Sequence, residues 1–179
     1  DITSKLTDFS QSADTHVSAI PTSGAIDLGA AETANSYIVY EPGVYTFKAV
    51  KGNSGNPLAS IGSVELLWET WGTTQEVTAN SVIAAVDFEK DQVYFRVDEN
   101  YHTGNAVIAV RNDMDAILWS WHIWLCDFDP DASARKTKNG MKLMDRNLGA
   151  TLSEFNGYDQ RDRASGMLYQ WGRKDPMNQ

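Results

Sequence analysis

Residues 105–123 read NAVIAVRNDMDAILWSWHI, in which two apolar runs flank the polar stretch RNDMD at 111–115. This stretch has the length and composition of a β-hairpin loop, and strands that are neighbours in the sequence pair at a low cost in loop entropy. The two runs are also the most hydrophobic in the chain. We therefore expect them to form a hairpin that lies in the centre of a β-sheet.

Short β-rich runs precede this hairpin, beginning at residue 36. They read SYIVY, VYTFKAV, SVELLWETW, SVIAAVDF and QVYFRV, and clusters of turn residues such as glycine, asparagine and aspartate separate them. No helical period occurs between them, and strands at this spacing are typical of an all-β sandwich or barrel. Pro42 followed by Gly43 suits the two central positions of a type II turn, so the pattern predicts that the first two runs form a hairpin.

Length, composition and charge exclude several classes of protein. The chain has 179 residues, of which 42% are hydrophobic and 22% charged, as is ordinary for a globular protein with its own core. No apolar run approaches the roughly 18 residues of a membrane-spanning helix. A net charge of −9 provides no basic surface for phosphate groups, so we expect no nucleic-acid partner. Cys126 is the only cysteine, which rules out a disulfide within the chain.

The charge is unevenly distributed along the chain. Residues 1–128 hold 6 Lys+Arg and 17 Asp+Glu, a net charge of −11, whereas residues 129–179 hold 9 and 7, a net charge of +2. We therefore divide the chain into a polar N-terminal arm at 1–35, a β-sandwich domain at 36–128, and a second part that packs on the sandwich. Because the chain starts at Asp1 without an apolar leader, we expect a processed form or an excised piece.

The stretch AILWSWHIWLCDF at 116–128 concentrates aromatic side chains, and successive side chains of a strand point to opposite faces. One face is wholly apolar and we expect it in the core: Ile117, Trp119, Trp121, Ile123 and Leu125. The other face is mixed: Leu118, Ser120, His122, Trp124 and Cys126. We expect the chain after Pro130 to cover this mixed face; the alternative is a sugar-stacking role for Trp124.

Catalytic and metal-binding patterns are weak in this sequence. His122 and Cys126 lie about 13 Å apart along a strand at roughly 3.3 Å per residue, too far for a thiolate–imidazole pair or one zinc ion. Phosphate-binding glycine motifs, a nucleophile elbow and HExxH are absent. Glu65 and Glu69 are paired carboxylates on a strand, whereas a carbohydrate-active enzyme needs acidic residues that converge in a cleft. We therefore expect no enzyme, no cofactor and no metal site.

Asp127, Asp129 and Asp131 form the pattern D-x-D-x-D, which resembles the start of an EF-hand calcium loop. The pattern then fails, because Ala132 stands at the sixth position, where glycine is required, and Lys138 at the twelfth, where a glutamate binds calcium. We interpret the run as a loop that ends a strand, and an irregular calcium site is the alternative.

Five segments between residues 33 and 176 form a further pattern. They read TANSYIVYEPGVYTFKAVKGNS, SVELLWET, GNAVIAVRNDMDAILWSWHIWLCDFDP, LMDRNLGA and GMLYQWGRKDP. Together and in this order they resemble the fimbrillin-like and major-paralogous-domain surface proteins of gut Bacteroidota. The most specific elements are ILWSWHIW and the combination of DRNLGA with YQWGRKDP. Proteins of this family are exported, and many are lipid-anchored or pilus-associated.

The resemblance implies a mostly β fold, in which an immunoglobulin-like antiparallel β-sandwich is followed by an irregular α+β segment similar to C-type lectins. This lectin-like domain would open near LMDRNLGA and continue beyond YQWGRKDP, so residues 129–179 would be an incomplete part of it. Family members carry a small hydroxyl or branched residue at the position of Cys126, which implies that the thiol has no family role. The implied location is the outer-membrane surface or the extracellular space.

On this basis we predict a non-enzymatic cell-surface or pilus-associated adhesion protein that contacts glycans. The expected partners are a glycan, a host or bacterial surface protein, or subunits of a pilus or surface assembly. The residues expected to contact the ligand are aromatic or charged: Tyr169, Trp171, Arg173 and Asp175. The alternative for Trp171 is that it fills the junction between the two parts. The alternative function is a structural module that binds a protein partner by strand addition, which the polar arm would permit.

Overall fold

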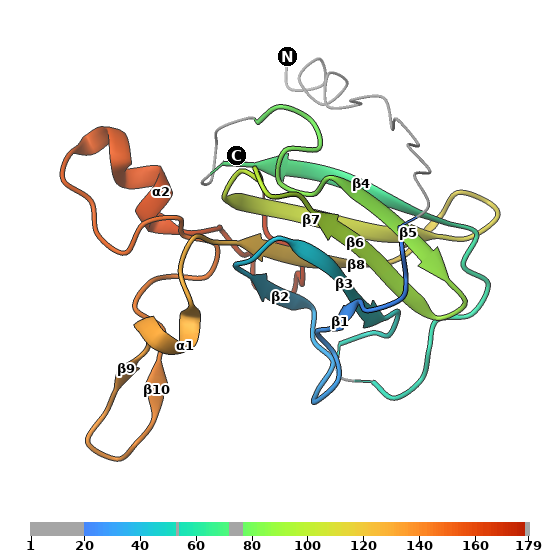
Figure 1. Ribbon diagram of the computed structural model, residues 1–179, viewed down its shortest axis with the longest axis horizontal. Helices are drawn as coiled ribbons and strands as arrows, with labels where there is room; N and C mark the ends of the chain where they lie inside the picture. Colours follow the sequence, from blue (N-terminus) through green and yellow to red (C-terminus); the bar gives the residue numbers. More distant parts are fainter. Residues whose placement is uncertain (1–19, 53, 72–76, 178–179) are drawn as a thin grey trace.

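The computed structural model describes residues 20–52, 54–71 and 77–177, and their fold is mostly β, as predicted (Figure 1). The strands are β1 (Ile26–Asp27), β2 (Ser36–Val39), β3 (Gly43–Lys48), β4 (Ser63–Thr70), β5 (Ala85–Glu89), β6 (Gln92–Val97), β7 (Gly104–Arg111), β8 (Ile117–Leu125), β9 (Arg135–Lys136) and β10 (Lys142–Leu143). The helices are α1 (Pro130–Ser133), the 3-10 helix η1 (Tyr158–Gln160) and α2 (Arg161–Ser165). Residues 1–19 of the predicted polar arm lie outside the described residues.

Two four-stranded sheets share one hydrophobic core and form the body of the molecule. One sheet has the strand order β1-β3-β6-β5 and the other β2-β8-β7-β4. Phe47 and Phe95 of the first sheet lie in one buried cluster with Ile108 and Trp121 of the second. The ring centroids of Phe47 and Trp121 are 5.0 Å apart. Rings of this size bury large apolar areas, so packing between the layers holds the sheets together.

The hairpin predicted from residues 105–123 is confirmed. β7 and β8 pair antiparallel along their length and occupy the two central positions of their sheet. In the connection, Asn112 Oδ1 accepts hydrogen bonds from the backbone N–H groups of Met114 and Ala116, at 3.0 and 2.9 Å. An asparagine side chain stabilises a turn in this way from within the loop itself, so the local sequence suffices to specify the hairpin.

The hairpin predicted for residues 36–48 is wrong. β2 pairs in parallel with β8, whereas β3 pairs with β1 and β6 in the other sheet. The Pro42-Gly43 step therefore carries the chain between layers, and Tyr45 Oη fixes this corner by donating to Glu41 O at 2.7 Å. Gly43 has a φ of 156°, far from the roughly +80° that a type II turn needs at this position. The parallel pairs β1–β3 and β2–β8 also depart from the purely antiparallel arrangement that we expected.

Strand β8 follows the predicted alternation except at its start. Three predicted core residues are fully buried: Trp121, Ile123 and Leu125. The core prediction is wrong for Ile117, which is 49% exposed, and holds only in part for Trp119, which is half-buried against the core. The reason is that β2 pairs with β8 only from His122 onward, so the first residues of β8 lie at a sheet edge.

Residues 129–177 form short elements beside the body. β9 and β10 pair only with each other among the described strands, and neither α1 nor α2 contains a buried residue. Figure 1 shows these helices and this two-stranded ribbon on one side of the two sheets. None of the described helices has the length and apolar character needed to cross a membrane. The position of the segment therefore depends on contacts that its loops make with the body.

Candidate functional site

The mixed face of β8 is covered by the chain after Pro130, as the sequence predicts. Ser120, His122 and Trp124 are all buried on this face. Two of the contacts come from the chain after Pro130: Asp175 bonds to Ser120, and Tyr169 bonds to His122. Trp124 packs on Phe128, which precedes Pro130 and is itself covered by Arg146. The alternative of sugar stacking by Trp124 is wrong, because its ring has no exposed surface.

A chain of hydrogen bonds connects two loops of the later chain through the buried side chain of His122. Tyr169 Oη lies 2.9 Å from His122 Nδ1, and His122 Nε2 lies 2.9 Å from Asn105 Oδ1. Asn105 Nδ2 in turn donates to Gly149 O at 2.9 Å. Because the Asn105 amide nitrogen is used as a donor, its oxygen accepts from His122 Nε2–H. The Nδ1 lone pair of His122 then accepts the hydroxyl proton of Tyr169.

This network is neutral near pH 7. Burial lowers the pKa of His122 to about 4, an effect that the negative charge of Asp175 only partly offsets. Burial also raises the pKa of Tyr169 to about 12. Both groups are therefore uncharged near neutral pH, and their hydrogen bond positions the chain.

Gly149 is constrained by the same network. Its φ is +83°, a conformation that residues with a side chain rarely adopt, and a Cβ atom there would collide with Met167 Cγ. The same Cβ would lie 2.8 Å from Asn105 Oδ1. The glycine in the NLGA motif therefore permits the close approach of residues 147–150 to β7.

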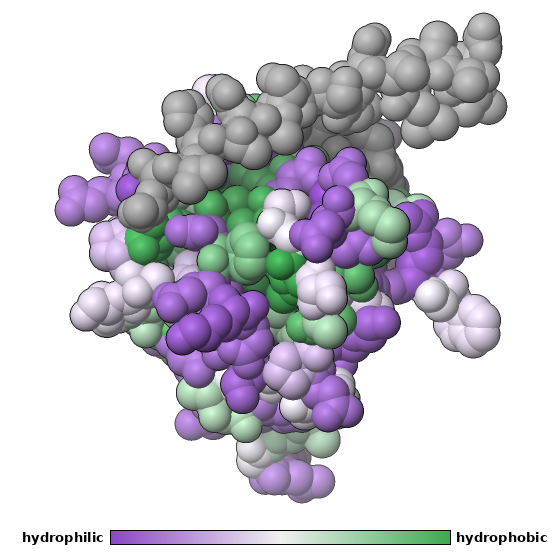
Figure 2. Space-filling view, turned by 90° about the vertical axis from the view of Figure 1, so that its right-hand side faces the viewer, coloured by the Kyte–Doolittle hydropathy of each residue, from purple (hydrophilic) through white to green (hydrophobic). Residues whose placement is uncertain are grey.

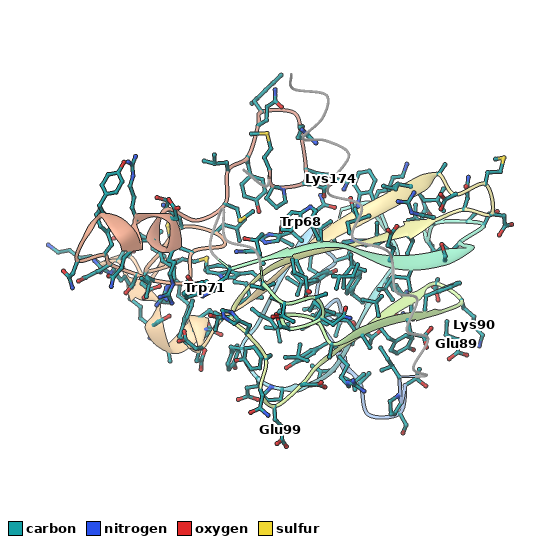
Figure 3. The ribbon with its side chains drawn as sticks, turned by 90° about the horizontal axis from the view of Figure 1, so that it is seen from above. Trp68, Trp71, Glu89, Lys90, Glu99 and Lys174 are labelled. Atoms are coloured by element: carbon teal, nitrogen blue, oxygen red, sulfur yellow. The ribbon has the colours of Figure 1, made fainter. Side chains whose placement is uncertain are left out.

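A second anchor joins the chain end to the edge of β8 through a cluster of three polar side chains. Ser120 Oγ donates to Asp175 Oδ2 at 2.7 Å, and Lys174 Nζ lies 2.6 Å from Asp175 Oδ1. Lys174 Nζ also donates to Ser120 Oγ and, at 3.0 Å, to Ser120 O. Figure 3 shows Lys174 over the sheet that contains β7 and β8, on the opposite side of the body from Glu99.

This cluster combines a serine with a lysine, but it lacks the features of a nucleophile and its base. Ser120 is only 3% exposed, so a substrate has no access to its hydroxyl. The Lys174 side chain is paired with the Asp175 carboxylate and also donates to the backbone oxygen of Ser120, so its nitrogen is engaged in holding the chain in place. The arrangement is a polar anchor.

A third contact secures the start of the segment. The Arg146 guanidinium carbon lies 3.5 Å from the centroid of the Phe128 ring, and Phe128 packs on Trp124 with the centroids 6.0 Å apart. Arg146 Nε and Nη2 also bond to the two carboxylate oxygens of Asp145, both at 2.8 Å. The hydrogen bonds from Arg146 lower the pKa of Asp145. The DRN motif therefore anchors the later chain to the end of β8.

Between the anchors at residues 169 and 174–175, the chain makes a tight turn. Arg173 N donates to Gln170 O at 3.0 Å. The φ of Gly172 is +83°, whereas the φ of Trp171 is not positive. These are the features of a type II turn with Trp171 and Gly172 at its centre. Outside the turn, Met177 N donates to Leu168 O at 2.7 Å and closes the two stems. The Trp171 side chain is 99% exposed.

The structure divides the four predicted ligand-binding residues into two pairs. Tyr169 and Asp175 point toward the body and serve as anchors. Trp171 and Arg173 lie on the turn and are exposed. The alternative that Trp171 fills the junction is wrong, because its side chain is 99% exposed. Several residues that hold the turn were not predicted: Asn105, Gly149 and Lys174.

The paired carboxylates of β4 have structural roles. Glu65 Oε2 accepts from Arg111 Nε at 2.5 Å. Glu69 accepts three backbone hydrogen bonds from residues 80–83, of which the shortest are those from Asn80 N at 2.6 Å and Ile83 N at 2.7 Å. Burial raises the pKa of Glu69, and these N–H groups partly counteract it. The two carboxylates are therefore engaged in separate interactions and do not form a pair.

The aspartates after β8 are also engaged separately. Asp129 Oδ1 caps α1 by accepting from Asp131 N and Ala132 N, and Asp131 pairs with Lys142 at 2.6 Å. In the described ranges, no group of three or more His, Cys, Asp or Glu side chains is placed to hold a metal ion. Cys126 is buried, which raises the pKa of its thiol to about 12 and makes it unreactive.

Comparison with known proteins gave no matching family model and no significant match to a curated protein or a solved structure. The resemblance to fimbrillin-like surface proteins therefore stays a prediction.

Proposed function

We propose that this chain is a non-enzymatic adhesion protein of the cell surface or a pilus, and that the Trp171 turn contacts a glycan. The observation that carries the proposal is the 99% exposure of Trp171 on a turn that is fixed at both stems. A tryptophan ring has an area of about 150 to 250 Å² to bury, and a ring presented on a rigid turn can stack on a sugar with little loss of conformational entropy.

The proposal extends to the type of fold. We take the two-sheet body as an immunoglobulin-like sandwich that presents the start of a C-type-lectin-like domain at residues 129–177. The short helices, the isolated ribbon β9–β10 and the long loops of this segment support the comparison with an irregular α+β domain. An exported protein at the outer-membrane surface is the setting in which such a turn would meet host or bacterial glycans.

A glycan array probed with the full chain tests the proposal. The Trp171→Ala variant should lose binding, since it removes the stacking ring without touching the anchors. Tyr158→Ala is the matched control, because Tyr158 is another aromatic residue of the segment and is 84% exposed outside the turn. Its binding should equal that of the unmodified chain. Equal binding by the unmodified chain and Trp171→Ala would contradict the proposed site.

A second candidate function is a structural module that accepts a strand from a protein partner. Among the described strands β4 pairs only with β7, so one edge of this eight-residue strand has no neighbour in the sheet. Figure 2 shows apolar side chains at the surface between hydrophilic groups on one end of the body. An unpaired strand edge can accept a further strand.

Deletion of residues 1–30 tests this second candidate. Multimer formation, measured by light scattering, should be abolished if the arm takes part in strand addition. A thermal melt followed by circular dichroism establishes that the shortened body remains folded. Unchanged assembly of a folded, shortened chain would count against strand addition.

A further inference from the structure

The Trp171 turn carries a cation beside its exposed ring. Trp171 and Arg173 are the second and fourth residues of the same four-residue turn, whose ends lie less than about 7 Å apart by the definition of a β-turn. Arg173 is exposed and has no carboxylate partner among the described residues. The turn therefore presents an exposed planar aromatic surface and, two residues further along, an exposed guanidinium group.

The turn presents no negative charge to balance this cation. The nearest carboxylate in the sequence is that of Asp175, and both its oxygens are bonded, one to Ser120 and the other to Lys174. Lys174 also points inward, with its ammonium group 4.6 Å from the centroid of the Trp119 ring and bonded to Ser120 O. The charge of Lys174 is thus offset within the anchor, while that of Arg173 remains at the surface.

Charge is unevenly distributed between the two parts of the sequence. Residues 1–128 carry a net charge of −11 and residues 129–179 a net charge of +2, from 6 against 17 and 9 against 7 ionisable side chains. The part of the chain that carries the turn therefore lacks the excess of negative charge found in residues 1–128, which is compatible with an anionic ligand.

We infer that the ligand of the Trp171 turn is an anionic saccharide, in which a sugar ring stacks on Trp171 and a carboxylate or sulfate group pairs with Arg173. This inference rests on the proposed function and specifies its ligand class. Guanidinium groups bind carboxylates and sulfates through paired N–H donors, so the interaction is directional as well as electrostatic.

Titration calorimetry with the full chain tests the inference. The probes are polygalacturonate for carboxylates, heparin for sulfates, and carboxyl-reduced polygalacturonate as the neutral counterpart of the first. We expect binding of at least one anionic probe, with weaker binding of the neutral one and a decrease in affinity as salt is raised. The Arg173→Gln variant should bind the anionic probe with about ten-fold lower affinity, as expected for a lost hydrogen bond to a charged group.

Arg161→Gln is the matched control for charge. It removes one positive charge from α2, where Arg161 lies 5.6 Å from the Tyr158 ring centroid, and it leaves the turn unchanged. Affinity for the anionic probe should therefore stay within about two-fold of the original. Thermal melts of all variants verify folding.

The outcomes separate this inference from the proposed function. Binding of the neutral and anionic polymers with equal affinity, or anionic binding that Arg173→Gln leaves intact, would overturn the anionic ligand and leave the glycan-binding turn in place. Absence of binding to every glycan on the array and to all three polymers would overturn both. A loss confined to the carboxylate or to the sulfate probe would identify which of the two groups pairs with Arg173.

Discussion

The body at residues 20–128 buries its large apolar side chains between two sheets, whereas the segment at 129–177 leaves most of its own exposed. Among the described residues, twelve large hydrophobic side chains are exposed, and eight of them belong to the shorter segment: Met141, Leu143, Met144, Phe155, Tyr158, Leu168, Tyr169 and Trp171. The body is therefore stabilised by apolar burial, and the segment is held mainly by a few polar anchors.

This difference determines how each region responds to change. Burial of apolar area is additive and tolerant of small shifts, because it lacks direction. A hydrogen bond depends on distance, angle and protonation state, and each contributes only about 0.5 to 1.5 kcal/mol net. We therefore expect the body to fail globally when its core is disrupted, and the segment to detach locally when an anchor is lost.

The largest effect should come from Trp121→Ala in the core. Trp121 is fully buried between the sheets, and its indole N–H has no hydrogen-bond partner among the described residues, so packing alone is lost. We expect the free energy of unfolding to fall by about 3 to 5 kcal/mol, measured by urea denaturation. The same substitution at the exposed Trp171 should change it by less than about 0.5 kcal/mol. Equal losses of unfolding free energy at the two positions would contradict the view that apolar burial stabilises the body and not the segment.

The next largest effect should be a loss of stability in acid that comes from His122. Its pKa is 6.5 when unfolded and about 4 when folded, so the unfolded chain binds the proton first as the pH falls. The contribution of His122 to stability is complete above pH 6.5 and is lost between pH 6.5 and 4. The shift corresponds to a loss of roughly 3 kcal/mol in the free energy of unfolding.

Denaturation curves between pH 7 and 4 on the unmodified chain and on His122→Gln measure this effect. The variant cannot bind a proton at this position, so its stability should depend less steeply on pH across the window, whatever its absolute stability. Carboxylates that titrate in the same pH range contribute to both curves. Parallel curves would show that His122 is not buried as a neutral group beneath Tyr169.

The comparison also explains which parts of the fold the sequence predicts. The β7–β8 hairpin is encoded by neighbouring residues, since the two apolar runs and the Asn112 loop that joins them are all local. The corner at Pro42-Gly43 has the same local appearance as a hairpin turn. It differs only in the sheet that β2 joins, and β2 finds its partner β8 more than eighty residues later in the chain. Local patterns do not contain that information.

The candidate site was predictable to a similar degree. The residue types at 169–175 identified the region, but their division into anchors and exposed groups depends on which side chains meet the body. Tyr169 and Asp175 find His122 and Ser120, which are 47 and 55 residues away in the sequence. The mixed face of β8 was the one available signal, because its polar residues required partners from elsewhere in the chain.

The smallest predicted effect is the local release of the chain end by Ser120→Ala. The substitution removes the hydroxyl that donates to Asp175 and accepts from Lys174, while the ion pair between these two residues remains. One hydrogen-bonded anchor of this kind contributes about 1 kcal/mol. Hydrogen exchange should therefore accelerate about five-fold at the amides of Arg173 and Met177, which close the turn and its stems, with no change in β7 and β8.

Ser165→Ala is the matched control for that experiment, because Ser165 Oγ donates within α2 itself, to Arg161 O at 2.8 Å. It should leave exchange at Arg173 and Met177 unchanged. If Ser120→Ala instead accelerates exchange throughout β8, the anchor stabilises the sheet itself, and the division between a body held by burial and a segment held by polar contacts is too sharp. If neither variant changes the exchange, the Ser120 hydroxyl is not needed to hold the turn, and the rigid presentation of Trp171 depends on the Tyr169–His122 hydrogen bond and on the Met177–Leu168 backbone bond.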